Sequence, residues 1–557
     1  METILETRSC PNCQQKFSVT DADQVLYDKL QVPRPKLCPD CRQQRRLAFR
    51  NERYMYRRKC DFSGKDIISM YPPDSPFKIY DQDIWWSDQW DALSYGRDFD
   101  FARSFFEQFR ELQLAVPRVA LVNKQSENSL YNNHAQRNKN CFMNAVVFDS
   151  EDVYYSDWII EHARDCMDCS YLFGGCELCY ETYYAWSSYK AVFCDFIKSC
   201  SDVWFCYDCF GTKNSFMCSN LRNKEYCIRN KQYTKQQYEE EMKKIFPLSY
   251  EKLQELRREY LDMKETKAIR QALYWVQVEN STGDLLFQTK NCFHTFDAIN
   301  DEDSRYLLDT IGLKDSMDNY HVGWASLMYE CHAISNGYNC KFCHFTYDNA
   351  NCTYCDCTQN SKNLFGCAGL NRKEYCILNK QYTKEEYEEL VPRIIEHMKK
   401  TAEYGEFFPI QFAPFAYNQS RAQEYYPLNQ DAAQQKNIRW SQYDAPIPDV
   451  KKHLEPSEVP ATIQATTDEI LDQAITCEVT KKPFRIIKQE LQFYRKMGLP
   501  VPRRHPDQRY LDRMIQRNPR KLWQRNCMNC NVEIQTSYAQ ERPCKVYCEK
   551  CYLAAVY

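Results

Sequence analysis

The sequence has little of what most enzymes and membrane proteins need. Glycine accounts for only 13 of its 557 residues, and there is no glycine-rich phosphate loop, nucleophile elbow or His-Glu-x-x-His motif. These absences argue against the common nucleotide-binding, hydrolase and zinc-peptidase classes. No run of 18 apolar residues occurs, so we expect no transmembrane helix. The first residues lack the apolar stretch of a signal peptide, and we therefore expect a cytoplasmic protein.

Cysteine, by contrast, is abundant, with 31 residues. In a cytoplasmic protein thiols stay reduced, which favours metal binding over disulfides. A secreted disulfide scaffold is the alternative, but an odd number of cysteines fits complete pairing poorly. Apolar residues make up 43% of the chain and aromatic residues 15%, so we expect a packed protein rather than a disordered one.

The net charge of −3 hides a strong segregation of charge. Residues 1–60 carry 13 Lys and Arg against 7 Asp and Glu, and residues 481–557 carry 17 against 6. Two basic ends therefore flank an acidic middle. Such an asymmetry indicates contact with a polyanion.

The two ends of the chain are similar to one another. An ungapped offset of 467 residues places Cys10 over Cys477 and Cys60 over Cys527. We therefore predict a duplicated module with the same backbone at both ends. The further matches pair Phe17, Tyr27, Lys29, Pro39, Asp40, Arg42, Arg46, Arg50, Asn51, Arg53 and Arg58 with Phe484, Tyr494, Lys496, Pro506, Asp507, Arg509, Arg513, Arg517, Asn518, Arg520 and Arg525.

Each copy of the module keeps a different set of four cysteines. Two Cys-x-x-Cys pairs in each copy have the spacing of a zinc ribbon, in which four thiolates surround one ion. We expect about two Zn²⁺ per chain, both structural, because a four-thiolate site leaves no position for a substrate. At the decayed positions of the second copy, Cys477 and His505 are expected to pack rather than bind metal. The predicted ligands are Cys10, Cys13, Cys38 and Cys41, and Cys527, Cys530, Cys548 and Cys551.

Arginines follow the second cysteine pair of the first copy at helical spacing. We predict a capped helix at Asp21–Leu30 and a second helix that starts at Pro39. The second helix puts Cys38 and Cys41 at its positive end, as in a treble clef. Arginines stacked on one face repel each other, so we predict contact with the phosphates of RNA or DNA. The alternative is that they pack on aromatic rings or pair with the acidic middle. The predicted nucleic-acid-binding residues are Arg42, Arg46, Arg50 and Arg53, with Arg509, Arg513, Arg517 and Arg520.

The middle of the chain contains two repeat arrays. Residues 221–240 match residues 370–389 at 15 of 20 positions. A cysteine series with a step of 12 precedes each match, at Cys194, Cys206 and Cys218, and at Cys331, Cys343, Cys355 and Cys367. A short fixed period of this kind predicts a β-solenoid-like array with small inward cysteines. Each period could be one coil, or half of a wider one. The Cys-x-x-Cys pairs within the arrays could bind further metal, but a ladder of buried thiols explains the step more directly.

These observations predict an α+β multidomain protein. Capping boxes at Thr234–Gln237 and Thr383–Glu386 start a helix after each array, and residues 249–272 form a long bridging helix. The predicted segments are a zinc module (1–90), a helical connector (91–127), array 1 (128–233), a helical bridge (234–275), array 2 (276–382), a helix (383–404), a linker (405–470) and a second zinc module (471–557).

Several strings of the sequence resemble one uncharacterised family of zinc-ribbon and cysteine-repeat proteins from uncultured small-genome bacteria. The resemblance implies the architecture and no activity. Its strings are Cys10-x-x-Cys13 with Cys38-Pro-Asp-Cys41-Arg42, WWSDQW at 85–90, FFEQF at 105–109, NKEYCI at 223–228 and RHPDQR at 504–509.

Three functions follow as hypotheses. The first is a zinc scaffold that contacts nucleic acid with weak sequence specificity. The second is a protein-interaction scaffold with structural zinc. The third, an enzyme, has little support: Asp81, Asp83 and Asp88 beside Trp85, Trp86 and Trp90 could form a carbohydrate-like cleft, but one strand or turn explains them equally well.

Overall fold

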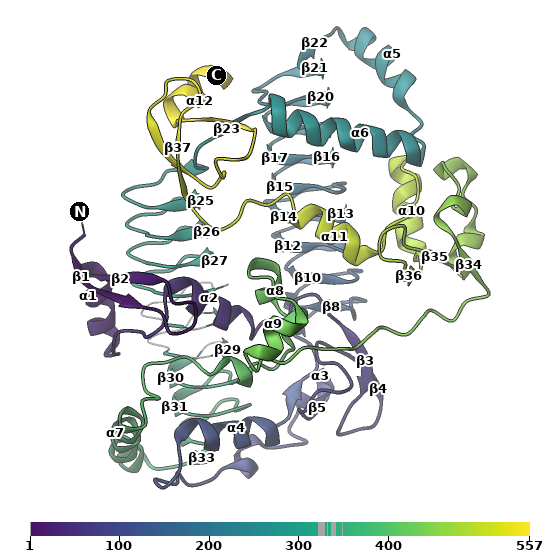
Figure 1. Ribbon diagram of the computed structural model, residues 1–557. Helices are drawn as coiled ribbons and strands as arrows, with labels where there is room; N and C mark the ends of the chain where they lie inside the picture. Colours follow the sequence, from purple (N-terminus) through teal and green to yellow (C-terminus); the bar gives the residue numbers. More distant parts are fainter. Residues whose placement is uncertain (1, 321–328, 331, 336–340, 343, 348) are drawn as a thin grey trace. The chain divides into compact units, whose positions relative to one another are not determined.

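The computed structural model describes all residues except 1, 321–328, 331, 336–340, 343 and 348 (Figure 1). Its described part mixes many short strands with 12 α-helices, α1 to α12. The chain divides into two compact units. Unit 1 comprises Met1–Leu121 and Leu273–Tyr443, and unit 2 comprises Val122–Ala272 and Asp444–Tyr557. Each unit therefore combines one terminal module with the array that is not its neighbour in the sequence.

The N-terminal module, in unit 1, consists of two hairpins, each followed by helical structure. Helix α1 begins after Thr20, whose side chain forms the predicted capping box with Asp23, and α2 begins at Pro39 as predicted. However, α2 ends at Leu47, so Arg50 and Arg53 lie beyond the helix on which they were predicted. The elements are β1 (Ile4–Ser9), β2 (Lys16–Thr20), α1 (Asp21–Leu30), α2 (Pro39–Leu47), β3 (Tyr56–Lys59), β4 (Asp66–Ser69), β5 (Ile79–Tyr80) and α3 (Gln82–Trp85).

The C-terminal module, in unit 2, repeats this order of elements. Helices α10 and α11 begin at Lys488 and Pro506, the positions that the ungapped match of the two ends aligns with the first residues of α1 and α2. Helix α11 ends at Met514, so Arg517 and Arg520 lie beyond its end. The elements are β35 (Gln473–Thr476), β36 (Pro483–Phe484), α10 (Lys488–Met497), α11 (Pro506–Met514), β37 (Trp523–Asn526), β38 (Glu533–Thr536), β39 (Lys545–Tyr547) and α12 (Glu549–Val556).

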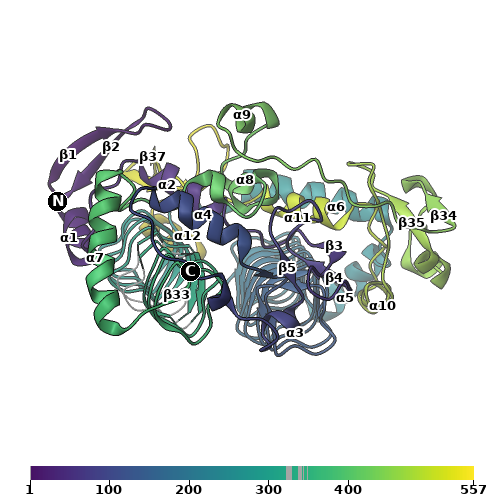
Figure 2. The ribbon, with the colours of Figure 1, turned by 90° about the horizontal axis from the view of Figure 1, so that it is seen from below.

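Array 1 consists of parallel strands that pair with the strand one period later. Asp195 pairs with Tyr183 in the period before it and with Tyr207 in the period after it. One 12-residue period is therefore one full turn of the chain rather than half of a wider turn (Figure 2). One sheet contains β8 (Asn132–Asn133), β10 (Asn144–Val147), β12 (Asp157–Ile160), β14 (Ser170–Phe173), β15 (Tyr183–Trp186), β17 (Asp195–Lys198) and β19 (Tyr207–Phe210). A second contains β16 (Tyr189–Val192), β18 (Ser201–Trp204), β20 (Lys213–Phe216), β21 (Glu225–Ile228) and β22 (Lys231–Gln232).

A left-handed residue recurs at every third position of these turns. The residues Phe193, Phe196, Ser199, Asp202 and Phe205 have φ between 51 and 56°. Each corner turns the chain, and the residue after each corner faces the interior. Four small or apolar side chains thus fill the inside of one turn: Cys194, Ile197, Cys200 and Val203 are each at most 2% exposed.

Array 2, in unit 1, has the same parallel pairing. Lys362 pairs with Glu374 in the same 12-residue register. Cys331, Cys340 and Cys343, part of the predicted cysteine pattern, lie outside the described residues. The strands are β24 (Trp275–Val276), β25 (Gly283–Phe287), β26 (Thr295–Ile299), β27 (Leu308–Ile311), β28 (His332–Ser335), β29 (His344–Tyr347), β30 (Ala350–Thr353), β31 (Lys362–Phe365), β32 (Glu374–Ile377) and β33 (Lys380–Gln381).

Each array ends in an antiparallel hairpin followed by a helix. The hairpins are β21–β22 and β32–β33, and α5 (Lys235–Ile245) and α7 (Lys384–Lys400) follow with the two predicted capping boxes. The bridging helix is shorter than predicted, because α6 (Tyr250–Asp262) gives way to a π-helical turn and to β23 (Ile269–Gln271), which pairs with β39. The predicted linker is also partly structured, since it contains α8 (Arg421–Tyr425), α9 (Gln430–Gln435) and β34 (Lys452–Leu454).

Helix α4 (Phe105–Ala115) lies in the predicted connector. No helix in the described part of the chain is both long enough and apolar enough to cross a membrane.

Candidate metal centres and the arginine docking sites

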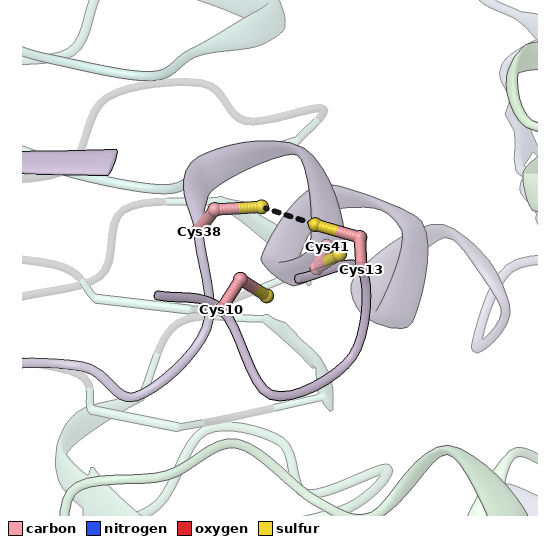
Figure 3. A group of neighbouring side chains, drawn as sticks. All are labelled: Cys10, Cys13, Cys38 and Cys41. Carbon is pink, nitrogen blue, oxygen red and sulfur yellow. Dashed lines mark hydrogen bonds between the residues drawn. The ribbon is translucent and has the colours of Figure 1, made fainter. Parts of the chain in front are cut away.

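The first candidate metal centre gathers the four predicted cysteines of the N-terminal module. Cys10 and Cys13 lie in the turn between β1 and β2, Cys38 is the N-cap of α2, and Cys41 lies in its first turn. Their four Sγ atoms all lie within 4.8 Å of one another. Figure 3 shows the four side chains directed at one point, with Cys13 Sγ and Cys38 Sγ 3.7 Å apart. Two distant segments of the sequence therefore form one compact cluster of thiols.

This geometry fits a tetrahedral metal ion. A Zn–S bond of about 2.3 Å implies sulfur atoms about 3.8 Å apart, which agrees with the Cys13–Cys38 distance. Burial raises the pKa of Cys10, but backbone N–H groups of Cys38, Cys13 and Asn12 outweigh it and lower that pKa to about 6. The Asn12 side chain also donates to Cys41 Sγ at 3.1 Å. The thiolate of Cys10 is thus favoured before a metal binds, whereas the pKa of Cys13 and that of Cys38 are raised by burial and by the neighbouring thiols.

The second centre has the same construction in the C-terminal module. Cys527 and Cys530 lie in the turn between β37 and β38, Cys548 is the N-cap of α12, and Cys551 lies in its first turn. The four Sγ atoms again lie within 4.8 Å of one another, and Cys530 Sγ is 3.7 Å from Cys548 Sγ. Although burial raises the pKa of Cys527, backbone N–H groups of its neighbours lower it to about 6. These two groups can hold two metal ions.

The other hairpin turn of each module keeps its shape without the metal ligands. Cys60 Sγ accepts the N–H of Asp81 at 3.2 Å, as Cys527 Sγ accepts that of Cys548 at 3.2 Å. Cys477 Sγ accepts the N–H of Thr480 at 3.4 Å. These thiols stabilise the turns through hydrogen bonds, in agreement with the packing role predicted for Cys477. Since Cys60 and Cys527 are equivalent positions of the two modules, the duplication hypothesis expects this match.

His505 also takes part in packing and hydrogen bonding. Its Nδ1 atom accepts the N–H of Asp507 at 3.1 Å, and its ring packs edge-on against Phe484. It therefore caps α11 rather than contributing to a metal group in the described part of the chain.

The arginines of α2 are buried against array 2. Arg42 and Arg46 are each 1% exposed, and Asp318 is 0% exposed. Arg42 Nε lies 2.8 Å from Asp318 Oδ2, and Arg46 Nη1 lies 3.2 Å from Asp318 Oδ1. Burial lowers the pKa of Arg42, but the carboxylate of Asp318 outweighs this effect, and the net result is a pKa well above the ordinary value. One array carboxylate therefore pairs with two helix arginines.

The arginines of α11 make the same contact with array 1. Arg509 and Arg513 are each 2% exposed, and they lie 3.3 and 3.2 Å from the carboxylate of Asp168. Asp168 is 0% exposed. Both units thus join module to array through two arginines and one buried aspartate.

Further contacts around these aspartates are duplicated. Lys29 pairs with Asp315 at 2.6 Å, and Lys496 with Asp165 at 3.0 Å. The rings of Tyr27 and Tyr329 lie 6.0 Å apart, edge to face, and those of Tyr494 and Tyr180 lie 5.9 Å apart. The phenol of Tyr306 contacts Asp23, as that of Tyr155 contacts Glu490. The two units therefore contain the same docking interface.

This interface accounts for most of the predicted arginines within the protein. Arg42, Arg46, Arg509 and Arg513 are buried and ion-paired with aspartates of the acidic middle, as the alternative expected. Arg50 is buried and paired with Glu52 of its own module. Contact of these arginines with nucleic acid stays a prediction. Arg53, Arg517 and Arg520 are only partly buried, and each has an interaction within the protein. Sequence reasoning missed Asp168 and Asp318, although their separation is close to the offset that relates the two arrays.

The tryptophans of the WWSDQW string belong to the packing of unit 1. Trp85 is 4% exposed, and its Nε1 atom donates to the Pro117 carbonyl at 3.0 Å. Trp90 packs against Trp85 and donates to its carbonyl. Asp81 caps α3 by accepting the N–H of Asp83. Packing and helix capping therefore account for Trp85, Trp90 and Asp81.

The array cysteines form hydrogen bonds rather than metal groups in the described part of the chain. Among the described residues, groups of three or more potential ligand atoms within 4.8 Å of one another occur at the two centres described above, and these contain no array cysteine. The described cysteines are all free thiols. Cys200 Sγ, for example, donates to the Cys209 carbonyl at 3.1 Å, and burial raises the pKa of Cys200 to about 12. This agrees with the buried thiol ladder.

No protein-family model matches the sequence, and no curated protein is similar enough to match it.

Proposed function

We propose that the protein is a scaffold in which structural zinc holds two docking modules and the arrays present binding surfaces to protein partners. The observation that carries this proposal is the duplicated interface, in which Arg42 and Arg46 engage Asp318 as Arg509 and Arg513 engage Asp168. The basic helices serve internal assembly, so the basic charge of the ends does not require a polyanion. The localisation we propose is cytoplasmic.

The metal contributes to this assembly through the helices. Zinc at Cys38 and Cys41 would fix the first turn of α2, which carries Arg42 and Arg46 on to Asp318. The parallel strands with a 12-residue register support a β-solenoid-like scaffold, and the thiol-to-helix geometry supports a treble clef. We also propose that this chain is related to the zinc-ribbon and cysteine-repeat family that its sequence resembles.

The outward columns of the arrays have charge patterns suited to a rigid scaffold. In array 2, Lys290 lies 3.3 Å from Glu279, and Lys314 lies 2.9 Å from Glu302. Alternating charge along a column leaves little net field for a nucleic acid backbone. Protein partners, which recognise shape and local charge, suit such a surface better.

Binding measurements test this proposal against the nucleic-acid hypothesis. The zinc-loaded protein would be titrated with fluorescent single-stranded RNA and duplex DNA at several salt concentrations, and its cellular partners would be recovered by cross-linking and mass spectrometry. We expect specific protein partners and no salt-sensitive nucleic acid binding. An affinity for RNA or DNA that falls steeply with salt, and that Arg53→Gln with Arg520→Gln weakens, would support nucleic acid contact instead.

A further inference from the structure

The two arrays end in the same hairpin, but the surroundings of the two hairpins differ. The six residues from Asn230 to Lys235 are identical in sequence to those from Asn379 to Lys384. The turn residues Arg229 and Asn230 have φ of 49 and 63°, and Leu378 and Asn379 have 44 and 63°. In each hairpin a lysine ammonium lies 5.3 Å from the neighbouring tyrosine ring. The two hairpins therefore present the same groups in the same backbone conformation.

In unit 1, a segment of the N-terminal part of the chain covers the hairpin. The Asn379 side chain donates to the Ala92 carbonyl at 3.0 Å, and the Arg97 N–H donates to the Leu378 carbonyl at 3.1 Å. The carboxylate of Asp98 accepts from Lys380 Nζ at 2.5 Å and from the Tyr382 hydroxyl at 3.0 Å. Ala92–Asp98 therefore binds through one backbone carbonyl, one backbone N–H and one carboxylate.

Gly96 allows the segment Ala92–Asp98 to lie close to the backbone of the hairpin β32–β33. A Cβ atom on Gly96 would lie 2.6 Å from the Asn379 carbonyl oxygen and 2.9 Å from Lys380 Cα. Those are backbone atoms, so a larger residue could not be accommodated by a side-chain rotation. The hairpin thus selects a glycine followed two residues later by a carboxylate.

In unit 2, the corresponding groups of the hairpin are open. Asn379 and Leu378 are 0% exposed, whereas Asn230 and Arg229 are exposed, as is Lys231. The Asn230 amide still donates to Ser219, which matches the Asn379–Ala368 bond. Figure 1 shows β21 and β22 at the end of the array-1 strands, before α5. Among the described residues, α6 reaches this hairpin through Glu259, which pairs with the Arg229 guanidinium. The hairpin thus keeps the same conformation while Asn230 and Lys231 stay exposed.

We propose that the hairpin β21–β22 is a binding site for an acidic segment of a partner protein, one that carries a glycine followed by a carboxylate as Ala92–Asp98 does. This inference rests on the proposed scaffold function and names one of its sites. Lys231 and Tyr233 donate to the partner's carboxylate, and the Arg229 carbonyl accepts a backbone N–H of the partner segment. Ala92–Asp98 of each copy is used on its own array 2, which favours a different protein over a second copy of this chain.

A peptide of Trp90–Phe101 from this chain is a suitable probe. Its affinity for the zinc-loaded full-length protein would be measured by fluorescence anisotropy at low salt. Lys231→Glu should weaken binding at least tenfold through charge repulsion, and Tyr233→Phe about tenfold through loss of one hydrogen bond to a charged group. Lys198→Glu, which reverses an exposed charge elsewhere on array 1, should leave the affinity unchanged. In the peptide, Gly96→Val and Asp98→Asn should each weaken it at least tenfold.

Other outcomes would overturn the site. Equal affinity for wild type, Lys231→Glu and Tyr233→Phe would place the peptide elsewhere, and no binding at millimolar peptide would reject the chemistry. A wild-type dimer in sedimentation that Lys231→Glu dissociates would identify a second copy as the occupant. If cross-linked protein partners persist unchanged in the hairpin variants, this site fails while the scaffold proposal stands.

Discussion

At the scale of single residues, the inward cysteines act as small hydrogen-bonding groups. Cys194 Sγ donates to the Val203 carbonyl at 3.4 Å, and accepts the N–H of Cys206 at 3.4 Å from the next turn. Asn144 occupies an equivalent place earlier in the array, where it donates to the Val153 carbonyl and accepts the N–H of Ser156. The position therefore requires a side chain that is small and able to hydrogen-bond, and cysteine is one of several that qualify.

This account predicts a clear order of substitutions at Cys206, which is 0% exposed. Cys206→Ser should cost about 1 kcal/mol or less, since serine fills such positions elsewhere in the array. Cys206→Leu should cost about 1–3 kcal/mol or more, because the inside of the turn has no room for it. Urea unfolding of the two variants measures the difference. Equal costs would mean that size does not govern the position, and Lys198→Leu on the exposed surface serves as the control.

A buried carboxylate inside array 2 gives the second prediction. Burial raises the pKa of Asp301 to about 7, although hydrogen bonds from Thr310 and from the backbone of Leu313 and Gly312 oppose the rise. Its ordinary pKa is 3.8, so between about pH 4 and 7 the folded protein holds a proton that the unfolded chain has lost. The stabilising contribution of this proton is complete below pH 4 and is lost as the pH rises through 7, with a slope of up to about 1.4 kcal/mol per pH unit.

Asp301→Asn should remove this part of the pH dependence and make the protein more stable than wild type at pH 8. The amide oxygen can still accept the N–H of Leu313, which lies 2.7 Å from the carboxylate now. Unfolding free energies at pH 5, 6, 7 and 8 for both proteins provide the comparison. Asp83→Asn, at an exposed position, should leave the unfolding free energy unchanged at each pH. Parallel curves of unfolding free energy against pH for wild type and Asp301→Asn would contradict the assignment.

At the scale of elements, the helices α2 and α11 are held by one buried aspartate each. Arg42→Gln should destabilise the docking of α2 by about 1.5–3 kcal/mol, because it removes a hydrogen bond to the buried Asp318 carboxylate, which keeps Arg46 as a partner. Arg509→Gln should do the same for α11 and Asp168. The double change Arg42→Gln with Asp318→Asn should cost less than the sum of the two single changes, which a double-mutant cycle of unfolding free energies would measure. Additive effects would show that the two residues do not interact.

The sequence predicts these elements unevenly. The helix starts at Asp21 and Pro39 follow from Thr20 and the proline, which act locally. The early end of α2 and the burial of Arg50 depend on contacts with distant segments, which no local pattern encodes. The metal clusters were predictable because two-residue spacing brings thiolates to one ion regardless of the rest of the fold.

The corners of the arrays, unlike the metal clusters, could not be predicted from the sequence. Left-handed residues usually indicate glycine, yet here Phe193, Ser199 and Asp202 take that conformation. Each costs about 1 kcal/mol or more locally, and the hydrogen bonds between successive turns offset the cost. A scarcity of glycine therefore concealed the most regular feature of the fold.

At the scale of the whole molecule, each module supports the array that is distant from it in the sequence. If the two proposed sites hold zinc, Cys38→Ser should release one of the two ions, because three thiolates hold zinc less tightly than four. Elemental analysis should fall from about two zinc ions per chain to about one. Hydrogen exchange should then increase around Asp318 in array 2, and not in array 1, which is the nearer array in the sequence.

Cys548→Ser is the matched variant, and it should increase exchange around Asp168 in array 1. Retention of both zinc ions in either variant would contradict the four-thiolate sites. Faster exchange in the adjacent array rather than the distant one would contradict the division into these two units.

The three-residue spacing of the corners has a consequence for how such a chain can change length. Successive turns lie about 4.8 Å apart, so inserting one whole period would extend an array by that distance and return every later side chain to its original column. Inserting a single residue would turn the later inward-facing side chains outward, unless the extra residue is accommodated at a corner. Two turns of array 1 are longer than the others by a single residue, since Asp157 pairs with Ser170 and Ser170 with Tyr183. Each of them has two consecutive left-handed residues at one corner, Glu161 with His162 and Gly174 with Gly175. Related chains should therefore differ by whole turns, or by single residues placed at that one corner.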